Sequence, residues 1–482
     1  MGAKMKQLFA ELFGFACFQG FLFALFVMGP NVPLSIGSLE FHRGSLFVVL
    51  ISAAIMLALL RCLPSAALRD RMKPALTYLY ALLLIAASFL LLFLGETYQI
   101  LGLVAASVQG LALAPLLCCW GRLLGSLDLD DASFIVILGS VVGAVVAALC
   151  CLAPEYLGHV LIDLLPLGAA STLQIRLKEP LEYAEAQAPS AKAIDLSGRI
   201  MAGALVFGVG CGFAHSYVGV FAGAEVSFMA SLLIFVMLGV AALQIFFRSV
   251  AIASAPKENQ PQFAARQGSL TYVYRLAVLM MVAGFLFAPA LQHFTFNGQS
   301  IVFAGFLGLL MVLLVVFLIN ALTTSRDPVL TFSAGFALLL TGQALGLALG
   351  GLCNGLMAPG SFETWAFAIA GLFVLIAYLF LFTENDLGEL GTVVDAIDSF
   401  DEACERLVKE CGLSKREAEI LPLALKGRTG ERIAEQFVIS KSTVDTHLRR
   451  IYGKCGVHSR QELIDLGERT AEEVARQQRN SQ

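Results

Sequence analysis

One short polar stretch near the C-terminus carries side chains that could bind a nucleic acid. Residues 441–454 are expected to form a helix whose apolar side chains Val444, Leu448 and Ile451 recur on one face. The other face carries basic, hydroxyl and carboxylate side chains, which can contact phosphates or base edges. The candidate DNA-binding residues are Lys441, Ser442, Asp445, Thr446, Arg449, Arg450 and Lys454. A solvated charged helix face would look broadly similar, so the neighbouring elements matter.

Three further helices are predicted around this one. Ser414 and Glu417 have the spacing of a capping box and open the first helix, in which Pro422 should introduce a kink. A second helix is expected over 430–437 and a fourth over 460–466. A tight connection joins the second helix to the basic one. Two short helices joined in this way, the second of which carries basic side chains, are typical of a helix-turn-helix.

This stretch resembles the LuxR-type (NarL/FixJ-like) helix-turn-helix. The resemblance is carried by Leu413, Ser414, Lys415, Arg416, Glu417, Gly427, Ile433, Ala434, Ser442, Thr443, Val444, His447, Ile451, Tyr452, Lys454, Ser459 and Arg460. It implies a four-helix bundle that binds operator DNA as a dimer and regulates transcription. The third helix would enter the major groove, with His447 in a structural role.

The same resemblance implies which side chains meet DNA. Contacts to bases are implied for Asp445, Thr446 and Arg449. Contacts to the backbone are implied for Ser442, Arg450 and Lys454. The family usually has Lys or Arg where this chain has Asp445. Phosphate repels a carboxylate, although cytosine can donate to one, so an altered operator preference is expected.

The rest of the chain is too apolar for a soluble protein. Of its 482 residues 58% are hydrophobic and only 14% are charged, against about 25% charged in soluble domains. Twelve apolar runs are long enough to cross a bilayer as helices. They are residues 8–28, 45–62, 75–94, 98–117, 133–152, 157–175, 201–220, 226–247, 271–291, 300–320, 329–350 and 362–382. The predicted fold is all-α, with about twelve transmembrane helices (6+6) followed by a soluble four-helix domain.

The charges between the runs predict the topology. Lysine and arginine gather in alternate loops, with Arg43 the main exception, and such loops face the cytoplasm. We therefore expect a multi-pass protein of a bacterial inner membrane with both termini cytoplasmic. The membrane domain, 1–383, has halves 1–175 and 200–383 joined by a cytoplasmic loop, 176–199. This layout resembles the major facilitator superfamily.

Polar side chains inside the runs are candidates for a small-molecule site. Speculative ligand-binding residues are Gln19, Gln109, His215 and Gln343. A polar group buried in lipid needs a partner, which a ligand can supply. The alternative is an interhelical hydrogen bond.

An acidic connector, 384–412, leads to the helix-turn-helix domain, 413–470, and a polar tail, 471–482. Apolar residues recur at heptad spacing along the connector. They are Leu390, Val393, Ile397, Phe400, Cys404, Leu407 and Cys411. One interpretation is a homodimer through residues 390–411. The other is an amphipathic helix that packs on its own DNA-binding domain or on the membrane face.

Together these features predict a membrane-anchored, one-component transcription regulator. It would sense a small molecule or a membrane signal, with DNA, the lipid bilayer and a small-molecule ligand as partners. One alternative is a transporter of the major facilitator type with a regulatory DNA-binding tail; another is a scaffold whose tail binds protein. The net charge of −4 excludes no partner. No catalytic constellation, metal site or cofactor motif is found in the sequence, so an enzyme is not expected.

Overall fold

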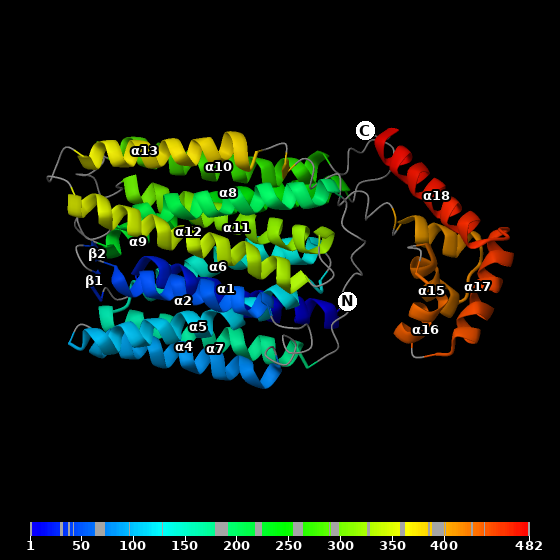
Figure 1. The fold of residues 1–482 in the computed structure, drawn as a ribbon, viewed down its shortest axis with the longest axis horizontal. Coiled ribbons are helices and arrows are strands. Elements are labelled where there is room, and N and C mark those ends of the chain that lie inside the picture. Colours follow the sequence, from blue (N-terminus) through cyan, green and yellow to red (C-terminus); the bar gives the residue numbers. More distant parts are fainter. Residues whose placement is uncertain are drawn as a thin grey trace. The chain divides into compact units, whose positions relative to one another are not determined.

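The computed structural model describes the chain except for residues 1, 29–31, 37–38, 42, 63–72, 96, 128, 179–190, 217–223, 254–263, 289, 291–297, 325–327, 357–361, 384–385, 388–399, 401, 426–427, 438 and 481–482. Each predicted apolar run is occupied by a helix (Figure 1). These helices are α1 (Gly2–Met28), α2 (Gly44–Cys62), α4 (Pro74–Leu94), α5 (Gln99–Leu124), α6 (Leu129–Cys150), α7 (Glu155–Arg176), α8 (Ala191–Ser216), α9 (Ala224–Ala253), α10 (Ala264–Phe287), α11 (Gly298–Thr324), α12 (Pro328–Leu356) and α13 (Phe362–Ile376), which continues as a π-helix, η1 (Ala377–Leu381).

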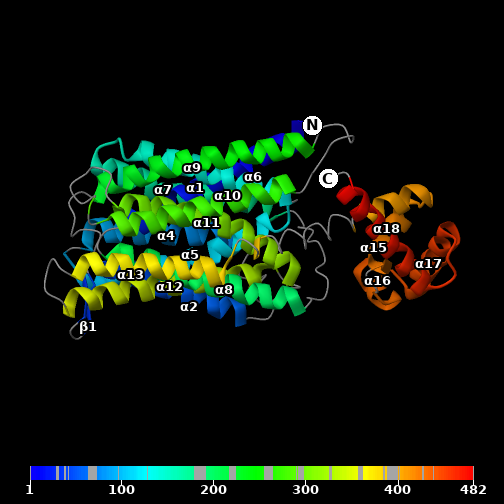
Figure 2. The same ribbon diagram turned by 90° about the horizontal axis from the view of Figure 1, so that it is seen from above.

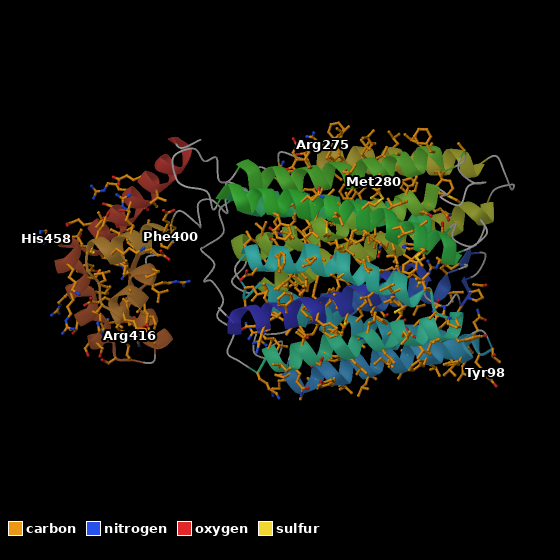
Figure 3. All side chains as sticks on the ribbon, turned by 180° about the vertical axis from the view of Figure 1, so that it is seen from behind. Tyr98, Arg275, Met280, Phe400, Arg416 and His458 are labelled. Atoms are coloured by element: carbon orange, nitrogen blue, oxygen red, sulfur yellow. The ribbon has the colours of Figure 1, made fainter. Side chains whose placement is uncertain are left out.

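The outside of this helical bundle is apolar. Within the described residues, nine helices are long and apolar enough to cross a membrane, and three shorter apolar helices lie at Phe228–Gln244, Thr271–Phe287 and Phe367–Leu381. The spans in α1 and α11 are 89% and 94% buried, and α11 runs through the middle of the bundle in two views (Figures 1 and 2). Large apolar side chains such as Ile100 and Met237 are exposed on the outer helices, and Tyr98 projects from one end of the bundle (Figure 3). So much exposed apolar surface suits lipid, and the chain is a multi-pass membrane protein.

One small sheet departs from the all-α prediction. Strand β1 (Leu34–Ile36) pairs antiparallel with β2 (Leu39–Phe41) in the connection between α1 and α2. Leu34 lies opposite Phe41. Two three-residue strands are too short to give a periodic signal in the sequence.

Glycine allows α8 and α12 to pack backbone against backbone. A Cβ atom added at Gly212 would overlap the carbonyl of Gln343, and one added at Gly346 would overlap the carbonyl of Val209. Small residues at such contacts are favoured in membranes because association there depends on close packing. The two helices therefore form a tightly joined pair.

The chain divides into two compact units. One comprises residues 1–245 and 269–386, and the other comprises residues 246–268 and 387–482. The second unit holds α15 (Lys415–Leu425), α16 (Gly430–Phe437), α17 (Lys441–Cys455) and α18 (Arg460–Asn480). Residues 402–410 are helical too. We call the described residues of 402–480 the C-terminal domain.

Of two C-terminal helices, one agrees with its prediction and one is longer. Helix α15 begins after Ser414, as predicted, and runs through Pro422 to Leu425, while residues 426–427 lie outside the described residues. Helix α18 continues beyond its predicted end at residue 466, so most of the predicted polar tail, 471–482, is helical. The extension is stabilised because Thr470 and Val474 are buried.

The described residues of the connector from Phe400 to Cys411 pack on the DNA-binding domain. Cys404 and Leu407 are buried in one apolar cluster with residues of α15, α16, α17 and α18, and Phe400 and Cys411 pack against that cluster. This packing favours an amphipathic helix on its own DNA-binding domain for these positions, and the homodimer through residues 390–411 stays a prediction. The earlier heptad positions, Leu390, Val393 and Ile397, lie outside the described residues.

Candidate nucleic-acid interface

Helix α17 is held by one apolar face and two capped ends. Val444, Leu448 and Ile451 are buried in the apolar cluster. The Ser440 hydroxyl accepts a hydrogen bond from the Thr443 N–H at 3.1 Å, as an N-cap does. Gly456 ends the helix with φ 68°, a left-handed conformation that glycine adopts without strain. The opposite face of the helix is thereby fixed towards solvent.

Lys441 lies at the start of that exposed face. Its Nζ is 2.7 Å from the Glu431 carboxylate of α16, and both side chains are more than half exposed. The hydrogen bond from Lys441 lowers the pKa of Glu431. Exposed pairs of this kind stabilise little, so a phosphate group can replace Glu431 as the partner of Lys441.

Two hydroxyl side chains follow on the exposed face. The Ser442 hydroxyl is 2.8 Å from that of Ser440, and the Thr446 hydroxyl donates to the Ser442 carbonyl at 2.8 Å. Each oxygen keeps lone pairs that can accept from a base or from water.

Arg449 and Arg450 are the most available cations. Both are exposed, and among the described contacts of the C-terminal domain neither has a partner. Guanidinium groups bind phosphates and guanine edges in a bidentate manner. These two arginines can therefore turn to DNA without breaking a contact within the protein.

Asp445 is half-buried and faces another helix. Its Oδ1 would lie 3.1 Å from a Cβ atom added at Gly430, the first residue of α16. A carboxylate near a helix N-terminus is stabilised by the backbone N–H groups there. A positioning role within the domain thus stands beside the predicted contact to a base.

Lys454, a predicted contact to the DNA backbone, has partners within its own domain. Its Nζ donates to Glu417 Oε2 at 2.6 Å and to the Gly412 carbonyl at 3.1 Å. The Glu417 side chain is only 3% exposed, and it also accepts from the Ser414 N–H at 2.8 Å. The hydrogen bond from Lys454 and that from Ser414 lower the pKa of Glu417 to about 2. Lys454 therefore ties the end of α17 to the start of α15, a contact that the sequence analysis missed.

The four polar residues proposed for a ligand are all buried, but they do not meet at one place. Gln109 donates to the Ser88 hydroxyl at 2.7 Å, which joins α5 to α4. His215 and Gln343 contact other partners, described below. Gln19, on α1, is 1% exposed, and its Oε1 has no partner among the described atoms. Among the described contacts, none joins two of these four residues directly.

His215 and Gln343 belong to one polar cluster with Arg43 and Cys211. Arg43 donates to the carbonyls of Phe26 and Val27 at the end of α1, and its Nη1 is 3.1 Å from His215 Nδ1. The Gln343 amide is 3.7 Å from the Cys211 sulfur, one helical turn before His215. Arg43 is 2% exposed, so it is a buried, hydrogen-bonded group and not a solvated loop charge. This explains why Arg43 departs from the charge bias of the loops.

Asp163 is a further candidate that the sequence analysis missed. It lies within α7 and hydrogen-bonds to Ser88, which also accepts from Gln109. The signal was present, because a carboxylate inside the apolar run 157–175 is costly in lipid and usually functional.

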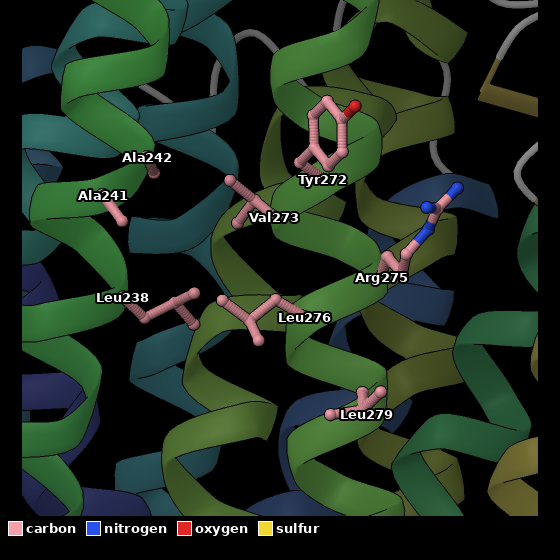
Figure 4. A pocket seen from close by; sticks show the side chains of 8 residues that line it. All are labelled: Leu238, Ala241, Ala242, Tyr272, Val273, Arg275, Leu276 and Leu279. Carbon is pink, nitrogen blue, oxygen red and sulfur yellow. The ribbon is translucent and has the colours of Figure 1, made fainter.

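A groove between α9 and α10 offers a different environment. It has a volume of about 390 Å³. Its lining comprises Leu238, Ala241, Ala242, Tyr272, Val273, Arg275, Leu276 and Leu279. Leu238 and Leu276 face each other across it, while the Arg275 guanidinium points away (Figure 4). The groove suits an acyl chain better than a polar ligand.

Within the described residues, no group of three or more His, Cys, Asp or Glu side chains could hold a metal ion.

Known proteins resemble the two parts of the chain separately. Residues 412–466 match the family described as "Bacterial regulatory proteins, luxR family". "Oxygen regulatory protein NreC" of Staphylococcus aureus strain JH9 is 47% identical over 53 residues, which are 11% of this chain and 24% of that protein, and the same protein of strain Mu3 matches equally. The chain thus spans about a quarter of the length of these curated relatives.

Solved transporters resemble the chain over most of its length. The human organic anion transporter MFSD10 (TETRAN) has a TM-score of 0.49 at 12% identity, covering 79% of this chain and 99% of its own. A POT family peptide transporter has a TM-score of 0.47 at 10% identity, covering 80% of this chain and 97% of its own.

The family match shows that residues 412–466 are a LuxR-family helix-turn-helix DNA-binding domain, which this chain joins to a multi-pass membrane bundle.

Proposed function

We propose that this protein is a membrane-anchored, one-component transcription regulator. Its membrane bundle senses a small molecule or a membrane signal, and its C-terminal domain binds operator DNA. The observation that carries the proposal is the two-sided character of α17. Val444, Leu448 and Ile451 hold one face in the core, and Arg449 and Arg450 stand exposed on the other.

Binding of DNA by the full-length protein in lipid nanodiscs tests this function. Fragments from upstream of neighbouring genes should bind, and the affinity should fall as salt rises because phosphate contacts release counterions. Arg449→Ala should weaken binding by about 5- to 150-fold, which corresponds to the roughly 1–3 kcal/mol of a good base contact. Lys409→Ala is the control, because Lys409 is 79% exposed on the connector helix and pairs there with Glu405 of the same helix.

Two outcomes would overturn the proposal. One is the absence of salt-dependent binding to any fragment, which would favour a scaffold whose tail binds protein. The other is an equal loss of affinity in Lys409→Ala and Arg449→Ala.

The sensing half of the proposal is supported by polar groups inside the bundle. Gln19 and Gln343 each keep a buried oxygen without a partner among the described atoms, and a ligand could supply a donor to either. We place the protein in a bacterial inner membrane with both termini in the cytoplasm, because the basic loops favour that side and the DNA-binding domain must reach the chromosome. Fusing a periplasm-active reporter enzyme to either terminus should give no activity, and activity would contradict this orientation.

A transporter with a regulatory DNA-binding tail is the second candidate. Asp163 favours it, because intramembrane carboxylates mark ion and proton pathways in transporters. Saturable uptake into proteoliposomes that is lost in Asp163→Asn would support transport. DNA binding that responds to a compound which is not taken up would support sensing alone.

A further inference from the structure

The chain leaves the membrane bundle through a firmly held joint. The Asp386 carboxylate, 1% exposed, accepts from the Thr383 N–H at 2.6 Å and from the Thr383 hydroxyl at 3.0 Å. Arg199 of α8 lies 2.6 Å from the same carboxylate. The Arg199 side chain is 38% exposed, so this ion pair is of intermediate cost to break; what makes it costly is that the Asp386 charge would be left buried.

Phe382 packs beside this ion pair, against α8 and α10. It is fully buried, and a Cβ atom added at Gly203 of α8 would lie 2.6 Å from the Phe382 Cβ. Tyr274 of α10 donates a hydrogen bond to the Phe382 carbonyl, and the two ring centroids are 4.8 Å apart. We call Arg199, Gly203, Tyr274, Phe382, Thr383 and Asp386 the exit joint. Helix α8 contributes two of its six residues.

The other end of α8 belongs to the polar cluster of Arg43, Cys211, His215 and Gln343. There the α8 residue His215 contacts Arg43, which binds the last carbonyls of α1. The His215 ring also stacks on Phe303 of α11 at 4.5 Å between centroids. One end of α8 therefore contacts α11 and α12 and, through Arg43, α1, while the other end contributes residues to the exit joint.

Between its ends α8 has little room to deform. Gly208 and Gly212 bring its backbone against α12, and a Cβ atom added at Gly210 would lie 2.6 Å from Val374 of α13. A close-packed helix of this kind transmits a displacement because its neighbours cannot rearrange around it one side chain at a time. Arg199 and His215 are about 24 Å apart along α8, at 1.5 Å per residue.

The geometry points to α8 as the element that couples the polar cluster to the exit joint. A change at His215 or Gln343 shifts α8, and the shift loosens or tightens Asp386 and Phe382, from which the chain continues to the LuxR-family domain. The coupling rests on the proposed function only for its output, DNA binding. Arg199 and Asp386 are positioning residues in this account, since they hold the exit and contact no ligand.

Hydrogen exchange of the full-length protein in nanodiscs tests the coupling without using DNA. The reporters are the backbone N–H groups of Phe382, Thr383 and Asp386, which donate to Ala377 O, Asp386 Oδ2 and Thr383 O. Arg199→Gln should speed their exchange directly. His215→Ala should speed it at a distance by about fivefold or more, the low end of usual coupling between sites. His215→Gln, which can still accept from Arg43, should exchange like the natural protein.

A matched control separates coupling from general loosening. Arg176→Gln breaks an ion pair of the same length, 2.6 Å to Glu11, that joins α7 to α1 and not to α8. It should leave exchange at 382–386 unchanged. If His215→Ala does not fold, Gln343→Leu replaces it with the same expected effect. Unchanged exchange in the folded cluster variant, or equal acceleration in Arg176→Gln, would overturn the coupling.

The same samples separate this inference from the proposed function. DNA affinity is measured in the natural protein, His215→Ala and Arg199→Gln. Accelerated exchange with no DNA binding in any sample would support the coupling through α8 and contradict the proposed function as a transcription regulator. DNA binding with unchanged exchange at 382–386 would keep the regulator and reject the coupling.

Discussion

Replacing Lys454 by methionine distinguishes a structural tie from a DNA contact. Met keeps the apolar stem and removes the cation that Glu417 accepts from at 2.6 Å. Breaking a buried pair costs about 3–5 kcal/mol and an exposed pair about 0–1 kcal/mol. Because the Lys454 side chain is 39% exposed and that of Glu417 only 3%, we expect an intermediate loss of about 2 kcal/mol.

The assay is hydrogen exchange of the full-length protein in nanodiscs. A loss of about 2 kcal/mol raises the local opening constant roughly 30-fold. The effect should be seen at the Ser414 N–H, which donates to Glu417, and at the Leu413 N–H, which donates to the Val408 carbonyl. Arg450→Met is the matched control, because Arg450 is an exposed cation of the same helix.

The two variants should separate in opposite ways. Lys454→Met should speed exchange near 413–417 and leave the salt dependence of DNA binding nearly unchanged. Arg450→Met should leave exchange unchanged and reduce the salt slope by about one phosphate contact. If Lys454→Met reduces the salt slope and leaves exchange alone, Lys454 is a phosphate contact and the reasoning from the structure is refuted.

Three further outcomes are expected in the C-terminal domain. The pKa of Glu417 is lowered from an ordinary 4.5 to about 2, so the ionised Glu417 stabilises the folded domain fully above pH 4.5, and this contribution should be lost as pH falls towards 2. Hydrogen exchange of the Ser414 N–H, measured against pH, checks this. A protection of Ser414 that does not change with pH would contradict it. Gly456→Ala should destabilise the domain by about 1 kcal/mol because φ is 68°, whereas Gly453→Ala, in open space within α17, should stabilise it by about 0.5–1 kcal/mol; equal effects in thermal melts would reject this. Leu407→Ala should lower the free energy of unfolding of the domain by about 2–5 kcal/mol, because it leaves a cavity in the core, and should not change the oligomeric mass. A smaller oligomer with unchanged stability would support the homodimer through the connector instead.

Local signals in the sequence predicted most of the C-terminal elements. The bounds of α16 and the start of α17 agree with the prediction, because Ser440 caps the helix locally. The length of α18 was underestimated although Leu463, Leu466, Thr470 and Val474 continue a helical stripe in the sequence. That stripe was readable, and the polar composition of the tail obscured it.

Contacts between distant residues could not be predicted in the same way. Lys454 and Glu417 are 37 positions apart, and either could have faced solvent. Arg43 had the appearance of a loop charge until the fold placed His215 and the end of α1 around it. In both cases the partner depends on tertiary packing, which no spacing rule along one helix encodes.

Recovery of DNA cross-linked to the full-length protein in native membranes tests whether this membrane protein binds DNA through α17. We expect a few promoter fragments to be enriched with the membrane fraction and the Arg449→Ala, Arg450→Ala double variant to lose this enrichment. Equal recovery of DNA by the natural protein and the double variant would contradict a membrane-anchored regulator that binds DNA through α17.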